Sequence, residues 1–211
     1  MILVIIPAFN EEKTIGKIAK DISNKFDVLV VDDGSSDDTT KIAKYNGASV
    51  ITLRKNFGVD HAIDLGFKYA LKKRYKFVIT FDADGQHFFS DLKKIAKILQ
   101  KKKKDLVIGV RSKFPRISEK IFSFYSLKML KIKDLLTGLK GYNLEIYKKH
   151  GTYCSFNSIG TELSIFAIKS HYRIGTINIK VKERKDKPRL GGTIKANLRI
   201  FKSLIQVMYK M

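Results

Sequence analysis

The feature that most constrains the fold is an alternation of short apolar runs with longer segments of helical periodicity. Five runs rich in Val, Ile, Leu and Phe occupy residues 2–6, 27–31, 48–53, 76–81 and 105–110. Continuous runs of this kind are typical of strands covered on both faces. Between them, apolar residues recur every three or four positions, as on the buried side of a helix. The sequence therefore predicts an α/β fold with a mostly parallel sheet and helices on both faces.

Three polar clusters directly follow predicted strands, at residues 7–11, 32–37 and 82–87. Ligands of parallel α/β sheets bind beyond the carboxyl ends of the strands, so the clusters predict a single site. Neither G-x-G-x-x-G after the first strand nor G-x-x-x-x-G-K-[ST] is present, which removes the usual glycine-rich cradles for nucleotides. We expect Pro7 to end the first strand and Asn10 to cap the first helix.

The third cluster contains the candidate metal ligands. Asp82 and Asp84 are two residues apart at a strand end, where alternate side chains point the same way, and Gln86 continues the spacing. Carboxylate and amide oxygens suit Mg²⁺ or Mn²⁺ and not zinc. The alternative interpretation is a loop in which the Asp residues only cap turns.

The charge balance narrows the class of partner. The 211 residues suffice for one domain with a substantial core, and 42 Lys and Arg against 20 Asp and Glu give a formal charge of +22. Such a chain favours nucleic acid, an anionic membrane or a phosphorylated substrate. Without metal, the acidic clusters would repel nucleic acid. Cys154 is the only cysteine, which excludes an internal disulfide, and no run approaches the ~20 apolar residues of a membrane span.

The second half of the chain is less regular. Residues 111–133 and 193–211 mix apolar and basic side chains as basic amphipathic helices do. Between them the pattern predicts a polar loop at 134–140, strands at 142–147 and 174–181, a helix at 162–170 and a charged loop at 183–192.

Several short motifs carry a resemblance to a known family. I-P-A-F-N-E at 6–11 is similar to P-x-Y-N-E, and V-D-D-G-S at 31–35 and D-A-D-G-Q-H at 82–87 match V-D-D-G-S and D-A-D-x-Q-H. Further similarities are G-V-R at 109–111, D-L-L-T-G-L-K at 134–140 with Lys140 in place of Arg, and R-L-G-G at 189–192 with Arg189 in place of Lys. In this order they resemble the family 2 glycosyltransferases of GT-A fold, most closely the dolichol phosphate mannose synthase group. The resemblance covers nearly the whole chain and implies a Rossmann-like sheet.

The resemblance implies an inverting transfer of a hexose, mannose or glucose, from GDP-mannose or UDP-glucose to a polyprenyl (dolichyl) phosphate. It divides a single domain, 1–211, into a nucleotide-sugar- and metal-binding half, 1–110, and an acceptor- and membrane-facing half, 111–211. We expect a peripheral enzyme on the cytoplasmic face of an anionic membrane, with no nucleic acid as partner. The loop 183–192 is expected to close over the donor.

The resemblance also assigns roles to residues. Asp82, Asp84 and Gln86 would hold Mg²⁺ or Mn²⁺. Asp84, Arg184 and Asp134 would be catalytic, Asp134 as a base only if the acceptor is a hydroxyl, because a phosphate monoester is already anionic above its second pKa of about 6. The expected nucleotide-sugar contacts are Pro7, Phe9, Glu11, Val31, Asp33, Asp82, Ala83, Asp84, Gln86, Arg111, Arg184 and Arg189.

Alternatives stay open at this point. Glu11 could serve only a helix N-terminus and Asp33 only a turn. An enzyme of the same fold could transfer the sugar to a glycan hydroxyl. A basic nucleic-acid-binding protein would leave the acidic clusters unexplained. A sugar-nucleotide nucleotidyltransferase would need a G-x-G-T-R opening, which residues 6–11 lack.

Overall fold

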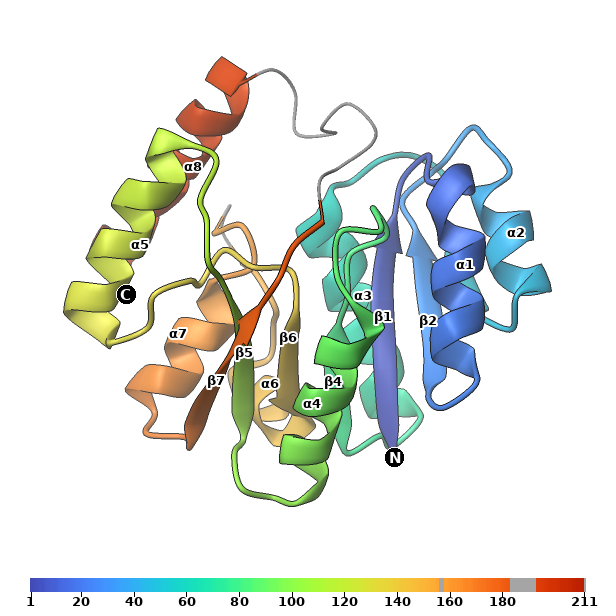
Figure 1. Ribbon diagram of the computed structural model, residues 1–211, viewed down its shortest axis with the longest axis horizontal. Coiled ribbons are helices and arrows are strands. Elements are labelled where there is room, and N and C mark those ends of the chain that lie inside the picture. The colour runs from blue at the N-terminus through green and yellow to red at the C-terminus, as the bar shows by residue number, and fades with distance from the viewer. Residues whose placement is uncertain (156–157, 183–192, 211) are drawn as a thin grey trace.

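The computed structural model describes residues 1–155, 158–182 and 193–210. Its centre is a seven-stranded sheet in the order β3-β2-β1-β4-β6-β5-β7 (Figure 1). Every neighbouring pair is parallel except the two that β6 makes with β4 and β5. The strands are β1 Ile2–Ala8, β2 Asp27–Asp32, β3 Ser49–Thr52, β4 Phe77–Thr80, β5 Leu106–Arg111, β6 Lys140–Asn143 and β7 Ile174–Ile179. The prediction of a mostly parallel α/β sheet is confirmed.

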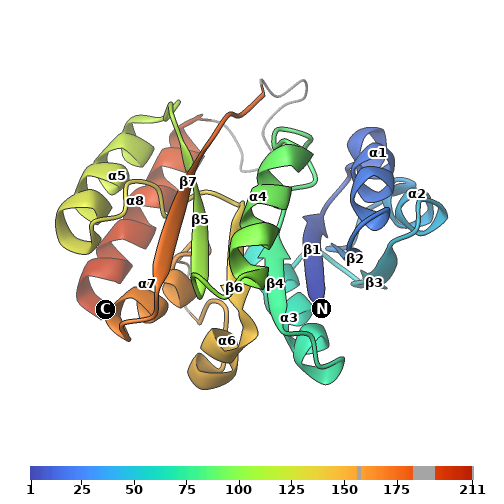
Figure 2. The ribbon, with the colours of Figure 1, turned by 60° about the horizontal axis from the view of Figure 1, so that its bottom comes forward.

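Helices cover both faces of this sheet (Figure 2). Buried side chains of α1, α2 and α4 form one core with the sheet, and those of α3, α5, α6, α7 and α8 form the other. Gly66 of α3 lies so close to β1 that a Cβ there would be 2.5 Å from Ile5 Cγ2. The helices are α1 Glu12–Ser23, α2 Thr39–Tyr45, α3 Val59–Lys72, α4 Phe89–Gln100, α5 Ile117–Leu130, α6 Leu144–His150, α7 Glu162–Lys169 and α8 Thr193–Lys210.

The start of the chain differs from the expectation at two residues. Pro7 does not end β1, which continues to Ala8 beside β2. The backbone of Ile5 faces β4, since its carbonyl accepts from Phe81 N, the residue after β4. Pro7 is two residues further along, so its backbone faces the same side, but there the pairing of β1 with β4 has already ended. Its missing N–H therefore breaks no ladder. Asn10 is not the helix cap, because α1 begins after Glu11; Asn10 has φ 54° and its side chain accepts from Ser36 N at 2.9 Å.

The expected strand at 142–147 is also wrong. The strand lies earlier, at Lys140–Asn143, and the helix α6 follows at once. Asn143 caps that helix, since its side chain accepts from Glu145 N at 3.2 Å. This shift removes Lys140 from the predicted loop and places it in the sheet, opposite Thr80 of β4 and Ile108 of β5.

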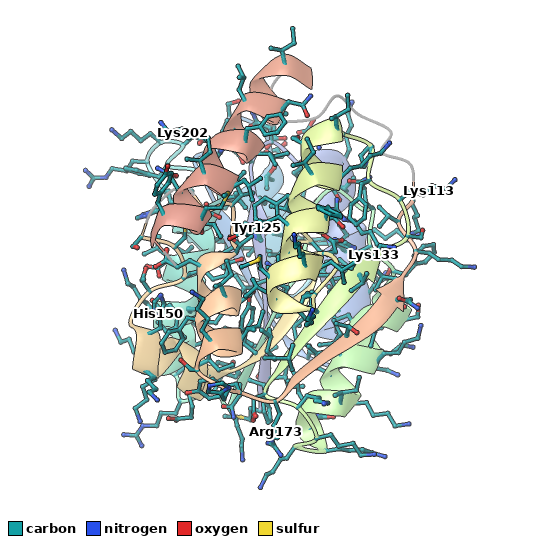
Figure 3. All side chains as sticks on the ribbon, turned by 90° about the vertical axis from the view of Figure 1, so that its left-hand side faces the viewer. Lys113, Tyr125, Lys133, His150, Arg173 and Lys202 are labelled. Atoms are coloured by element: carbon teal, nitrogen blue, oxygen red, sulfur yellow. The ribbon has the colours of Figure 1, made fainter. Side chains whose placement is uncertain are left out.

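Helices α5 and α8 lie side by side at one end of the sheet (Figure 3). Phe122 of α5 and Ile200, Leu204 and Val207 of α8 are buried in the core. Both helices also carry large apolar side chains on their outer side, and we call these residues the α5–α8 face. They are Ile117, Ile121, Phe124, Leu127 and Met129 of α5 and Ile194, Leu198, Ile205, Met208 and Tyr209 of α8, all exposed.

Candidate active site

The three polar clusters meet at one edge of the sheet, as predicted. They follow β1, β2 and β4, and these three strands are neighbours in the order β2-β1-β4. In the chain, β1 is followed by β2 on one side of it in the sheet, and β4 is followed by β5 on the other side. The carboxyl ends of β1 and β4 therefore lie at a topological switch point, where ligands of such sheets bind. The cluster after β4 adjoins Gly138, in the segment before β6, because a Cβ on Gly138 would lie 2.1 Å from Asp82 Oδ2.

The loop 82–87 is held from several directions. Thr14 Oγ1 of α1 donates to the carbonyl of Ala83 at 2.7 Å. Within the loop, Gln86 N donates to Asp84 Oδ1 at 3.0 Å. The Gln86 side-chain amide donates to the carbonyl of Lys182 at 3.0 Å, just beyond β7. That bond uses the nitrogen of the amide, so the oxygen is the atom left to face a ligand.

Asp82 is partly buried and lies near His87, Arg111 and Lys140, which all interact with its carboxylate. Its carboxylate is 3.0 Å from His87 Nε2, and 35% of its side chain stays exposed. Burial alone would raise the pKa of Asp82, but the hydrogen bond from His87 and the charges of Arg111 and Lys140 outweigh burial and lower this pKa. Asp82 is therefore ionised at neutral pH, as a metal ligand must be.

The candidate ligands fit a hard cation that also takes oxygens from a substrate. Among the described residues, no group of three or more His, Cys, Asp and Glu side chains could enclose a metal ion. Two carboxylates and an amide oxygen at Asp82, Asp84 and Gln86 are an incomplete shell. This matches Mg²⁺, which proteins usually bind through one or two carboxylates together with water and substrate phosphates.

The expected nucleotide contacts from the first two clusters lie at the same edge. Pro7 and Phe9 are half-buried, whereas the Val31 and Ala83 side chains are buried and leave only backbone atoms for a ligand. Glu11 is buried at the start of α1, and its backbone N–H donates to Thr39 Oγ1 at 2.8 Å. Their binding roles remain predictions.

Asp33 has a structural task that the sequence offered only as an alternative. Its Oδ1 accepts from Phe57 N at 2.8 Å, and its Oδ2 accepts from Gly58 N at 2.7 Å. The carboxylate thereby anchors the loop between β3 and α3 against the end of β2. If Asp33 contacts the nucleobase of the donor, it must do so with carboxylate oxygens that already accept two backbone hydrogen bonds.

Arg111 and Asp134, predicted to act on different substrates, are paired with each other. Arg111 donates to Asp134 from Nε at 2.8 Å, from Nη2 at 3.1 Å and from its backbone N–H at 3.1 Å. Arg111 Nη1 is also 3.5 Å from Glu119. Burial alone would lower the pKa of Arg111, but the hydrogen bonds and charges of Asp134 and Glu119 raise it. Asp134 is 1% exposed.

Two functional candidates have roles that the sequence left unassigned. His87 bonds the first Asp of the D-A-D motif, and its only sequence signal was its place in that motif. Lys140 is 1% exposed, and its Nζ donates to the carbonyl of Gly160 at 2.7 Å. Burial lowers the pKa of Lys140 to about 8, although the charges of Asp134, Asp60 and Asp82 oppose that shift.

Arg184, Arg189 and the expected closure of loop 183–192 lie outside the described residues. The site as described therefore consists of the loop 82–87, the ends of β1 and β2, the Arg111–Asp134 pair and Lys140.

Comparisons with known proteins agree with this geometry. The structure of glucosyl-3-phosphoglycerate synthase from Mycobacterium tuberculosis, solved with Mn²⁺, UDP and glucosyl-3-phosphoglycerate, superposes with a TM-score of 0.78 over 99% of this chain and 78% of that one, at 18% identity. The fold is thus that of the GT-A glycosyltransferases. Residues 3–161 match the model of glycosyl transferase family 2, and the chain belongs to that family.

Two relatives within reach of sequence comparison are similar to this chain over most of its length. An uncharacterized protein of Methanocaldococcus jannaschii is 36% identical over 70% of this chain and 67% of its own. The UDP-N-acetylglucosamine–dolichyl-phosphate N-acetylglucosaminyltransferase of Methanococcus voltae is 28% identical over 98% of this chain and 96% of its own. The predicted resemblance to family 2 enzymes near the dolichyl-phosphate sugar transferases is confirmed.

Proposed function

We propose that this glycosyltransferase moves a hexose, with inversion, from a nucleotide sugar to a polyprenyl phosphate. The Arg111–Asp134 pair is the observation that carries this choice of acceptor. Three hydrogen bonds from Arg111 occupy both oxygens of the Asp134 carboxylate, and Asp134 is 1% exposed, so an acceptor hydroxyl has little access to it. Asp134, the residue expected to activate a hydroxyl acceptor, is therefore already paired with Arg111. A phosphate acceptor, already anionic, needs no such base.

Donor binding would use the first half of the chain. Asp82, Asp84 and Gln86 would hold Mg²⁺ or Mn²⁺, which when bound neutralises the charge on a diphosphate leaving group. Phe9, Glu11 and the ends of β1 and β2 would bind the nucleoside. The proposed hexose is mannose or glucose. N-acetylglucosamine, an N-acetylated amino sugar, is the alternative, because the Methanococcus voltae relative carries it in its name.

A polyprenyl phosphate keeps its chain in a bilayer, so the enzyme must reach a membrane surface. Within the described residues, no helix has both the length and the apolar character needed to cross one. The α5–α8 face holds ten of the fifteen exposed large apolar side chains of the described chain. Basic residues lie on the same two helices: Lys120 and Lys128 on α5, and Lys202, which Figure 3 labels, on α8. We propose that this face rests on the anionic, cytoplasmic side of a membrane.

This docking is testable with substitutions that leave the core intact. Phe124 and Leu198 are 69% and 62% exposed, so Phe124→Ser with Leu198→Ser should change the free energy of unfolding little. We expect the double variant to lose about tenfold or more in binding to liposomes that contain anionic lipid, measured by co-sedimentation at low salt. Tyr45→Ser on α2, where Tyr45 is 91% exposed, is the matched control and should bind as the unmodified protein does. Equal binding by all three proteins would contradict the docking face.

The choice of acceptor is tested by comparing sugar transfer to three acceptors, each supplied separately. The protein in detergent is given each sugar nucleotide with a polyprenyl phosphate, the matching polyprenol, or an oligosaccharide. Because no base is needed for an anionic acceptor, we expect transfer to the phosphate and little or none to the alcohol. Transfer to the polyprenol or to the oligosaccharide, with none to the phosphate, would refute the proposal and favour the glycan-directed alternative.

A further inference from the structure

His87 is built around a single contact to Asp82. His87 is 7% exposed, and its ring packs edge-on against Phe81, with ring centroids 5.7 Å apart. Nε2 is 3.0 Å from Asp82 Oδ2, and because a carboxylate only accepts, Nε2 must carry the hydrogen. Nδ1 is buried and has no hydrogen-bond partner in the described part of the chain. Burial of an imidazole for one hydrogen bond indicates that this bond has a specific use.

The Gly138 backbone lies close to the same carboxylate. A Cβ on Gly138 would lie 2.1 Å from Oδ2 and 2.2 Å from Oδ1 of Asp82, far inside contact distance. Only glycine leaves room for the carboxylate at this position. Asp82 thus has the His87 ring and the Gly138 backbone as close neighbours, and part of its surface is still exposed.

We propose that His87 and Gly138 are positioning residues that keep the Asp82 carboxylate turned toward the metal and donor and away from the neighbouring cations. Arg111 and Lys140 both act on Asp82 electrostatically. A carboxylate without a fixed orientation would turn toward one of these cations, since a buried ion pair is strongly attractive in a poorly solvated region. The Nε2–H group of His87 donates one directed hydrogen bond to Oδ2 of Asp82, and this bond fixes the orientation of the carboxylate. The inference rests on the metal-binding role proposed for Asp82.

Metal binding can be measured without catalysis. The signal of free Mn²⁺ in electron paramagnetic resonance gives the Mn²⁺ affinity of the full chain in the presence of UDP or, separately, GDP. His87→Phe keeps a ring against Phe81 but removes the donor, and Gly138→Ala inserts the Cβ. Because partners that orient metal ligands typically contribute 10–100-fold to affinity, we expect each variant to bind Mn²⁺ at least about tenfold more weakly. His87→Gln, which can still donate, should recover most of that loss.

A double-mutant cycle separates positioning from general damage to the fold. If His87 acts through Asp82, His87→Phe should have no further effect on Mn²⁺ affinity in a protein that already carries Asp82→Asn. An undiminished effect in that background would assign His87 a merely structural role. Unchanged Mn²⁺ affinity in both His87→Phe and Gly138→Ala would overturn the inference. Absence of Mn²⁺ binding by the unmodified protein would refute the metal site itself and so the proposed function's metal.

Discussion

Chelation with excess EDTA should abolish sugar transfer, and added Mg²⁺ or Mn²⁺ should restore it. Asp82, Asp84 and Gln86 lie after β4, and in the proposed site they would supply an incomplete shell of hard oxygen ligands, which a diphosphate would complete. Neutralising the leaving group is worth several kcal/mol of barrier, so loss of the ion should cost about 10³-fold or more in kcat. The measurement is release of nucleoside diphosphate over time.

The same site predicts the behaviour of Asp84 variants. Asp84→Asn keeps an oxygen that can accept from Gln86 N, so the loop should stay folded while the charge that binds the cation is lost. We expect about 10³-fold lower kcat and no rise in melting temperature on adding Mn²⁺ with donor, a rise that the unmodified protein should show. Glu145→Ala, at an exposed residue of α6, is the control and should keep full activity. Full turnover in excess EDTA would contradict the metal-dependent mechanism.

Local patterns along the chain were sufficient to predict the parallel strands of the first half and the edge of the sheet where the site lies. The apolar runs are continuous, they alternate with segments of helical periodicity, and the polar clusters at 7–11, 32–37 and 82–87 follow strands that pair with one another. The errors have local causes. Pro7 is tolerated in β1 because β4, the strand that its backbone faces, has already ended. Asn10 has a positive φ, and its side chain accepts a hydrogen bond from Ser36 N and does not cap α1.

Contacts between distant segments could not be derived in the same way. The Arg111–Asp134 pair joins residues 23 apart, and the Thr14 bond to Ala83 joins residues 69 apart. No periodicity encodes such pairs, because each joins segments that only the tertiary fold brings together: the end of β5 with the segment before β6, and α1 with the segment after β4. The antiparallel insertion of β6 between β4 and β5 brings Lys140 beneath the site. A single sequence does not signal that insertion.

Lys140 should be indispensable, and its charge should set the alkaline limit of activity. It lies at the start of β6, 1% exposed, in the field of Asp60, Asp82 and Asp134. Lys140→Met would leave these carboxylates without that buried cation, a change that is usually strongly destabilising when charges are desolvated. We expect a loss of about 100-fold or more in kcat/KM for the acceptor. Lys140→Arg keeps a cation and should retain far more activity than Lys140→Met.

The pH dependence follows from the direction of the pKa shift. Burial lowers the pKa of Lys140 to about 8 in the folded protein, against about 10.4 in an unfolded chain. Below pH 8 both states carry the charge; between pH 8 and 10.4 the folded state has lost it, so kcat/KM for an anionic acceptor should fall as pH rises through about 8. In the arginine variant this decline should move to higher pH, because a guanidinium stays protonated. A decline at the same pH in both proteins would show that another group is responsible.

Stability should respond with the opposite sign. Between pH 8 and 10.4 the folded state binds fewer protons at Lys140 than the unfolded state does, so this residue makes unfolding less favourable as pH rises. The full effect is on the order of 3 kcal/mol, because one pKa unit corresponds to about 1.4 kcal/mol. Urea unfolding at pH 7 and pH 9.5 should therefore show the unmodified protein gaining stability relative to Lys140→Met. A constant difference between the two proteins across that range would mean that Lys140 keeps an ordinary pKa, and that its burial is offset by Asp60, Asp82 and Asp134.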